Sequence, residues 1–171
     1  MLCLIAISLS IVDDNLTEIK KYVEFGSIPR NYQAGTLDFK NGDNKGYVFF
    51  FEKGANNSRV VLTIDAREDF TKRNHRRAAF TANVNETVKG FQKKGWIVDK
   101  NKTKIPNVNE LDYDNKINQR LVFTNDQQQE LTVEMTFLFT KKSGISIMAL
   151  SEVQTDLDDL RKWVKNVKVI E

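Results

Sequence analysis

The sequence has few cysteine and histidine residues, which often form disulfides, bind metals or act in catalysis in a small protein. Its 171 residues include one cysteine, Cys3, and one histidine, His75. A single cysteine excludes an intramolecular disulfide and a thiol-rich zinc site, and a single histidine excludes a zinc site built from several imidazoles. His75 is therefore the one candidate imidazole for general base work, and we expect the chain to carry no cofactor.

Sequence motifs of nucleotide binding and of serine nucleophiles are also missing. The chain contains no glycine-rich phosphate-binding loop, no G-x-G-x-x-G segment and no G-x-S-x-G nucleophile elbow. The formal net charge is +3, a small excess beside that of most nucleic-acid-binding domains. These gaps argue against an enzyme and against nucleic-acid binding as the main function.

A chain of this length is most simply one domain, and its composition, 40% hydrophobic and 29% charged, is ordinary for a soluble globular protein. We place that domain at residues 13–171. Residues 1–12 are almost wholly apolar, too short to span a bilayer as a helix, and without the positive start of a signal peptide. Two interpretations stay open. Either the segment is the end of a signal sequence, which would place the protein in the periplasm or elsewhere outside the cytoplasm, or it is a buried strand of a cytoplasmic protein.

The clearest pattern lies in the last third of the chain. Every odd position from 131 to 139 is apolar, and the even positions are mostly polar: the odd residues are Leu131, Val133, Met135, Phe137 and Phe139. This alternation predicts a strand with one buried face. A turn at residues 141–144, a strand at 145–150 and an amphipathic helix at 156–167 follow, and Thr155 with Asp158 is expected to cap that helix.

The rest of the chain reads as a mixture of strands and helices. We expect a helix at residues 13–25, an extended segment at 32–40, and strands at 47–51, 60–64, 96–98 and 120–124. The strand at 47–51 is apolar on both faces and is expected to be buried on both. A long helix is predicted at 72–94, capped by Asp69 or Thr71.

These elements predict an α+β fold. We expect a mostly antiparallel sheet of about six to seven strands, with the long middle helix and the C-terminal helix packed on it in an α/β/α sandwich-like arrangement.

The first candidate contact surface is a basic run at residues 72–77. Its cationic members are Lys72, Arg73, His75, Arg76 and Arg77. Such a run can bind an acidic protein partner or, more weakly supported, the phosphates of a nucleic acid. It can equally be a solvent-exposed helix face balanced by the acidic residues just before it.

The second candidate surface is a long polar loop at residues 100–118. Ile105, Leu111 and Tyr113 are its apolar side chains for contact with a partner, although the same side chains can instead fix the loop to the core. A third candidate is the acidic cluster of Asp65, Glu68 and Asp69 with His75, whose oxygen ligands would suit a hard cation. Ion pairing with the neighbouring basic run is the alternative.

The order of elements resembles the small α+β sandwich of PsbP-type extrinsic photosystem proteins and bacterial DcrB-type extracytoplasmic proteins. The resemblance rests on three stretches: the extended segment and aromatic strand at 32–51, the long helix ending in Lys93-Lys94-Gly95-Trp96, and the final two strands and helix at 131–167. Those families share no catalytic signature, so the resemblance implies a non-enzymatic, partner-binding module that often acts outside the cytoplasm, and it assigns no site residue.

The leading hypothesis is a non-enzymatic protein-binding module, an accessory or inhibitor/immunity-type protein of a bacterium, with another protein as its partner. The alternative is a metal-dependent enzyme or binder that uses Asp65, Glu68, Asp69 and His75. A second alternative is weak nucleic-acid binding through the basic run. No transmembrane helix is expected.

Overall fold

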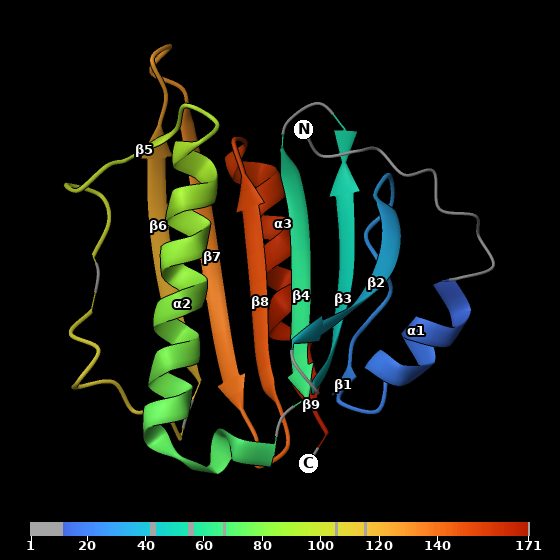
Figure 1. Cartoon of the computed structure of the whole chain (residues 1–171). Coiled ribbons are helices and arrows are strands. Elements are labelled where there is room, and N and C mark those ends of the chain that lie inside the picture. The colour runs from blue at the N-terminus through green and yellow to red at the C-terminus, as the bar shows by residue number, and fades with distance from the viewer. Residues whose placement is uncertain are drawn as a thin grey trace.

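A seven-stranded antiparallel sheet is the centre of the described part of the chain (Figure 1). The computed structural model describes residues 12–41, 44–54, 57–66, 68–104, 106–114 and 116–170. The strands are, in spatial order, β2 (Gln33–Asn41), β3 (Asn44–Lys53), β4 (Ser58–Ala66), β8 (Gly144–Ser151), β7 (Glu130–Phe139), β6 (Ile117–Thr124) and β5 (Ile97–Val98). The remaining elements are α1 (Val12–Ile19), β1 (Val23–Glu24), the 3-10 helix η2 (Glu68–Thr71), α2 (Arg73–Gln92), α3 (Gln154–Lys165) and β9 (Lys168–Val169).

The two long helices cover opposite faces of the sheet and opposite halves of it. Helix α2 lies over β6 and β7 on one face, and α3 lies behind β8 and β4 on the other (Figure 1). Each helix closes its own core cluster, one around Phe80 and Val84 of α2 and one around Leu160 and Trp163 of α3. The predicted α+β class, with an antiparallel sheet between a middle helix and a C-terminal helix, is confirmed.

Strand β7 follows the alternation seen in the sequence. Its odd-numbered residues, such as Val133 and Phe137, are buried beneath α2. On the opposite face, Glu134 accepts hydrogen bonds from the Arg161 guanidinium of α3, one of them 2.8 Å long. The strand therefore joins both helices to one sheet.

The prediction that residues 47–51 are buried on both faces is wrong. Tyr47, Phe49 and Phe51 are buried on the α3 face, but Val48 and Phe50 on the other face are only partly buried. The physical reason is the lateral position of α2, which lies over the far half of the sheet and leaves β3 uncovered on that side (Figure 1).

Helix ends also differ from expectation. The first helix stops at Ile19, and Val23 and Glu24 pair with Val169 and Lys168 in a small second sheet. The N-cap residues are Lys72 of α2 and Val153 of α3, and neither makes a side-chain cap hydrogen bond. Residues 68–71 are wound into η2, which leaves Lys72 as the N-cap of α2, and α3 begins at Gln154 directly after the short link from β8. Thr155 thus lies inside the helix instead of before it.

The apolar segment predicted at residues 1–12 lies outside the described residues, apart from the start of α1 at Val12. In the described part of the chain, no helix has the length and apolar character needed to cross a membrane.

Candidate functional site

The basic run at residues 72–77 forms the start of α2, and it lies against the long loop that was the second candidate surface. Arg76 is 8% exposed. Its guanidinium donates hydrogen bonds to the carbonyl oxygens of Phe70 and Tyr113, the latter at 2.9 Å, and pairs with the Asp114 carboxylate. The Arg76 side chain is therefore used inside the molecule and is not available to a partner.

Two further arginines hold the same loop. Arg73 donates hydrogen bonds of 3.1 Å to the carbonyl oxygens of Asn109 and Leu111, and its guanidinium lies 5.9 Å from the centre of the Tyr113 ring. Arg77 donates a 2.9 Å hydrogen bond to the side-chain oxygen of Asn109. Lys72 is exposed and His75 is partly buried. The structure thus brings the two predicted surfaces together as a helix end and the loop attached to it.

The apolar side chains of the loop point into the core on the α2 face. Tyr113 is 2% exposed, Leu111 packs against the same cluster, and burial raises the pKa of Tyr113. The Tyr113 hydroxyl donates a 2.9 Å hydrogen bond to the carbonyl of Val108. Ile105, the third predicted contact residue, lies outside the described residues. Leu111 and Tyr113 anchor the loop, so their apolar atoms offer little surface to a partner.

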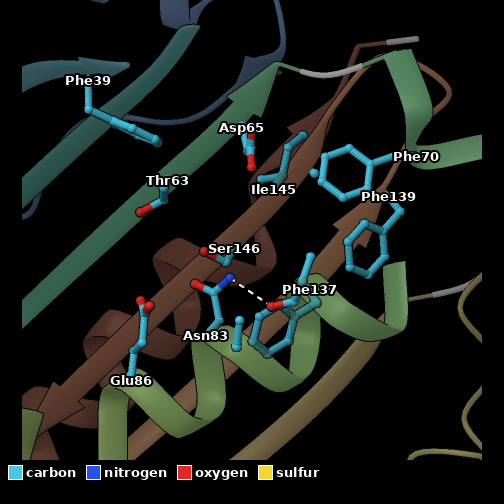
Figure 2. Close-up of a pocket in the computed structure, with 13 residues that line it drawn as sticks. Phe39, Thr63, Asp65, Phe70, Asn83, Glu86, Phe137, Phe139, Ile145 and Ser146 are labelled. Carbon is cyan, nitrogen blue, oxygen red and sulfur yellow. Dashed lines mark hydrogen bonds between the residues drawn. The ribbon is translucent and has the colours of Figure 1, made fainter. Parts of the chain in front are cut away.

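The acidic candidate site is only partly within the described structure. Asp65 lies at the end of β4 and points to the α2 face of the sheet (Figure 2). His75 lies in the first turn of α2, and the side chains of Glu68 and Asp69 lie outside the described residues. Among the residues that are described, no group of three or more His, Cys, Asp or Glu side chains is placed to hold a metal ion.

The surface that sequence reasoning missed is the uncovered half of the sheet on the α2 face. Residues directly opposite one another in neighbouring strands point to the same face. One such row runs Leu37, Val48, Thr63, Ser146 and Phe137. Phe137, beneath α2, is 1% exposed, whereas Leu37, at the far edge, is 45% exposed. Side-chain exposure therefore rises along this row from the core beneath α2 to the edge of the sheet at β2.

The next row of the sheet has the same character. It runs Gly35, Phe50, Val61, Met148 and Met135. Met135 is buried under α2, while Phe50, Val61 and Met148 are partly exposed. We call the surface formed by Leu37, Val48, Phe50 and Val61 the bare half of the sheet, since no helix in the described part of the chain covers it (Figure 1).

Two glycines flatten the bare half. The ring of Phe50 lies over Gly35, where a Cβ atom would come within 2.6 Å of it. The ring of Phe39 lies over Gly46, where a Cβ atom would come within 2.0 Å. With no side chain beneath them, the two rings lie close to the strands, so the surface is low and smooth.

A groove separates α2 from the bare half. It consists of two hollows, of about 250 Å³ and about 520 Å³, which share Glu86 of α2. We call their union the α2 groove, and its main lining residues are Val61, Thr63, Asp65 and Met148 on the sheet and Ala82 and Glu86 on the helix. Figure 2 shows the first hollow, with Asp65, Thr63 and Ser146 on the strands facing Asn83 and Glu86 of α2.

The charged residues of the α2 groove lie unevenly along it. Asp65 and Glu86 line the half that adjoins the middle of α2. Arg59, Lys93 and Lys94 line the half at the C-terminal end of α2. Arg59 is partly compensated by Glu52, 3.9 Å away, so the two lysines supply most of the positive charge there. Glu86 also lines the second hollow, so the α2 groove has a basic end at Lys93 and Lys94 but no separate acidic half.

A search of protein-family models, of curated proteins and of solved structures found no match to this chain.

Proposed function

We propose that this protein is a non-enzymatic protein-binding module and that the α2 groove, with the bare half beside it, is its contact surface. The observation that carries the proposal is the row of apolar side chains on the α2 face of β2, β3 and β4, where Leu37 is 45% exposed and Val48, Phe50 and Val61 are partly exposed. Contiguous apolar surface that neighbours a groove is typical of interaction sites, because leaving it in water costs free energy.

The opposite face of the same sheet provides an internal comparison. Helix α3 covers only part of that face, so β6 and β7 are left open there too. The hollow there is lined by Lys116, Asn118, Glu134 and Thr136 and, from the neighbouring elements, by Ala149, Arg161, Val164 and Lys165. Polar and charged side chains thus outnumber apolar ones at that opening, although Thr136 is buried and Glu134 is paired with Arg161. The apolar side chains of the bare half therefore support a surface that a partner protein covers in the functional complex.

The resemblance to PsbP-type and DcrB-type proteins supports the same class of function, because those families are non-enzymatic and act through partners. On this view the protein is an accessory or inhibitor-type protein of a bacterium. Exposed Lys72, at the start of α2, is then a candidate for contact at the rim, whereas Arg73, Arg76 and Arg77 serve the loop.

Site-specific photo-cross-linking tests the proposal. A benzophenone side chain is placed at Leu37, which is 45% exposed, or at Ile97, a matched exposed apolar residue on the opposite edge strand that is 61% exposed. In cells that naturally make the protein, we expect a discrete protein adduct from position 37 and none from position 97. Equal yields from both positions, or no adduct from position 37, would overturn the assignment of the surface.

A second change shows whether the adduct depends on the groove. Val61→Glu is expected to abolish the cross-link from position 37, because a carboxylate would enter the apolar floor of the α2 groove. The thermal unfolding curve of the variant establishes that the fold is intact. An undiminished cross-link in a folded Val61→Glu variant would contradict the proposal.

A further inference from the structure

The second hollow of the α2 groove, the one of about 520 Å³, has the character of a small-molecule site. We propose that it binds a small amphipathic carboxylate, an organic anion with an apolar body. The carboxylate pairs with the cationic side chains of Arg59, Lys93 and Lys94. The apolar body lies over Val61 and Met148 on the floor of the hollow. Such a ligand leaves the outer strands β2 and β3 open, so this site is additional to the protein contact proposed above.

The size of the hollow suits a small ligand. Its volume of about 520 Å³ falls within the range of about 300–1,000 Å³ that is typical of small-molecule sites. Along α2 its lining runs from Glu86 to Lys94, which is about 12 Å at the rise of an α-helix. On β4 it runs from Arg59 to Val61, which is about 7 Å at the rise of a strand. These dimensions accommodate a medium-length acyl chain or a pair of fused rings.

The lining of the hollow is largely apolar. The sheet contributes Val61, Met148 and Leu150, and the end of α2 with the residues after it contributes Phe91 and Trp96. Leu150 and Trp96 are buried, whereas Val61, Met148 and Phe91 are partly exposed. Apolar and aromatic walls with a few polar groups at one place are the usual make-up of a small-molecule pocket, because the walls bind the body of the ligand and the polar groups orient it.

Arg59 is the polar group that the fold leaves short of acceptors. It lies on the α2 face of β4, opposite Leu150 of β8, and its side chain is 34% exposed. In the described part of the chain its Nε is buried without a hydrogen-bond partner, and its Nη1 is 3.9 Å from Glu52, too far for a hydrogen bond. A guanidinium binds a carboxylate through parallel N–H donors. A ligand carboxylate would therefore supply acceptors that Arg59 lacks.

Lys93 and Lys94 add two ammonium groups to the same hollow. Both are exposed, and neither forms an ion pair with a described residue. The ammonium group of Lys94 lies 5.9 Å from the centre of the Phe91 ring, at the border of the apolar lining. Lysines near the C-terminus of a helix are favourable on their own account. That reason does not apply to Arg59, which belongs to the sheet.

The charges also set the position of the carboxylate within the hollow. Among the described lining residues, Glu86 is the acidic one, and it lies seven residues before Lys93, or about 10 Å along α2. The carboxylate of the ligand therefore lies beside Lys93 and Lys94, and the apolar body extends towards Glu86. The carbonyl groups at the end of α2 carry partial negative charge, which opposes a doubly charged phosphate more than a singly charged carboxylate.

NMR titration of the full chain with decanoate tests the inference. Decanol, with the same chain and no charge, and decyl phosphate, with a doubly charged head group, are the matched probes, each used below its micellar concentration. We expect decanoate to shift the Nε–H signal of Arg59 and the indole N–H signal of Trp96, and to leave that of Trp163, in the other core cluster, unchanged. Decanoate should bind about tenfold more tightly than decanol, and more tightly than decyl phosphate.

Variants separate the charge from the apolar floor. Arg59→Met, and the double change of Lys93→Met with Lys94→Met, should each weaken decanoate binding by about tenfold. Arg120→Met is the matched control, because Arg120 is an exposed strand arginine on the opposite face, beside Glu134, and this change should leave the affinity unaltered. Thermal unfolding establishes that each variant is folded. If Arg59→Met does not fold, the change at the two exposed lysines decides.

Each contrary result has a definite meaning. Equal binding of decanol, or undiminished binding of decanoate by folded Arg59→Met, shows an adventitious apolar contact only and overturns the inference. Shifts at Trp163 without shifts at Trp96 place the ligand on the other face and overturn the site. Tighter binding of decyl phosphate overturns the carboxylate. If decanoate does not bind while the cross-link from position 37 persists, this inference fails and the protein-binding function stands.

Discussion

Replacement of Arg76 by methionine is the sharpest test of how the basic run is used. The side chain is 8% exposed, and its guanidinium donates to the carbonyl groups of Phe70 and Tyr113. Methionine occupies a similar volume but has no donors, so the change removes the hydrogen bonds and keeps most of the packing.

The expected loss follows from these contacts. A hydrogen bond from a charged donor contributes about 1.5–3 kcal/mol, and a buried carbonyl left without a donor adds to the cost. Part of this is recovered when water reaches the carbonyl groups at the helix end. The pair with Asp114 adds little, because that carboxylate is 89% exposed. We therefore expect Arg76→Met to lower the free energy of unfolding by about 3 kcal/mol, or Tm by about 6–12 °C for a chain of this size.

Urea unfolding measured by tryptophan fluorescence provides the assay, because Trp96 and Trp163 are both buried and lie in different core clusters. Hydrogen exchange of residues 106–114 shows whether the loop opens ahead of global unfolding. The matched control is Arg77→Met, which removes one exposed hydrogen bond to Asn109 and should cost less than about 0.5 kcal/mol.

A small effect would refute the structural role of Arg76. If Arg76→Met costs less than about 1 kcal/mol, or no more than Arg77→Met, the guanidinium does not hold the loop, and the basic run returns to being a candidate surface for an acidic partner.

Three further predictions concern single side chains elsewhere. Asp156→Asn should cost about 1 kcal/mol at pH 7, because the carboxylate accepts from Lys53 and Ser58. The Lys53 hydrogen bond lowers the pKa of Asp156 below its ordinary 3.8, so urea titrations should show the contribution complete above pH 3.8 and lost as the pH falls through the lower folded pKa. Burial raises the pKa of Tyr32 from 10.0 to about 12. The contribution of this group to the free energy of unfolding should therefore be complete below pH 10 and be lost as the pH rises towards 12. Tyr32→Phe should remove the step at highest pH from the tyrosine absorbance titration. Gly46→Ala should cost about 1–3 kcal/mol through collision with Phe39, and a double-mutant cycle with Phe39→Ala should recover most of it; no coupling would contradict the packing of that ring on Gly46.

The sequence predicts the elements of this fold better than their lateral placement. The strand expected from the alternation at residues 131–139 and the long helix expected at 72–94 come from local patterns, and both are confirmed, as β7 and α2. Which strands lie under which helix is not a local property. It is set by tertiary packing, and for that reason Val48 and Phe50 were wrongly expected to be buried.

A geometric argument would have located the bare half. Seven strands at the usual spacing make a sheet about 30 Å wide, and one helix is about 10 Å across, so a single helix covers about two strands. The face with α2 alone must therefore leave several strands open within the described chain. The apolar residues at 48 and 50 were visible in the sequence, but they were assigned to a second buried face.

The arginine-rich run shows a different limit. Its composition predicts an exposed cationic surface, but apart from Phe70 the carbonyl groups that Arg73 and Arg76 contact belong to residues 109, 111 and 113, more than 30 residues along the chain. No spacing rule links positions so far apart. Only the folded chain brings the loop over the start of α2, where Arg76 is buried and Arg73 and Arg77 contact the loop while remaining exposed.

The side of α2 that holds the loop is therefore opposite the side for which we propose binding. The loop and its arginine anchors lie on one side of the helix, and the α2 groove lies on the other (Figure 1). Neither of the two core clusters includes Leu37, Val48, Phe50 or Val61, so exposed members of the bare half can change with little loss of folding free energy. Val61→Glu should then abolish the cross-link from position 37 with little change in Tm, and Arg76→Met should lower Tm and keep that cross-link at temperatures below the melting transition. If each variant changed both Tm and the cross-link, the side of α2 that stabilises the fold would not be separate from the side that binds.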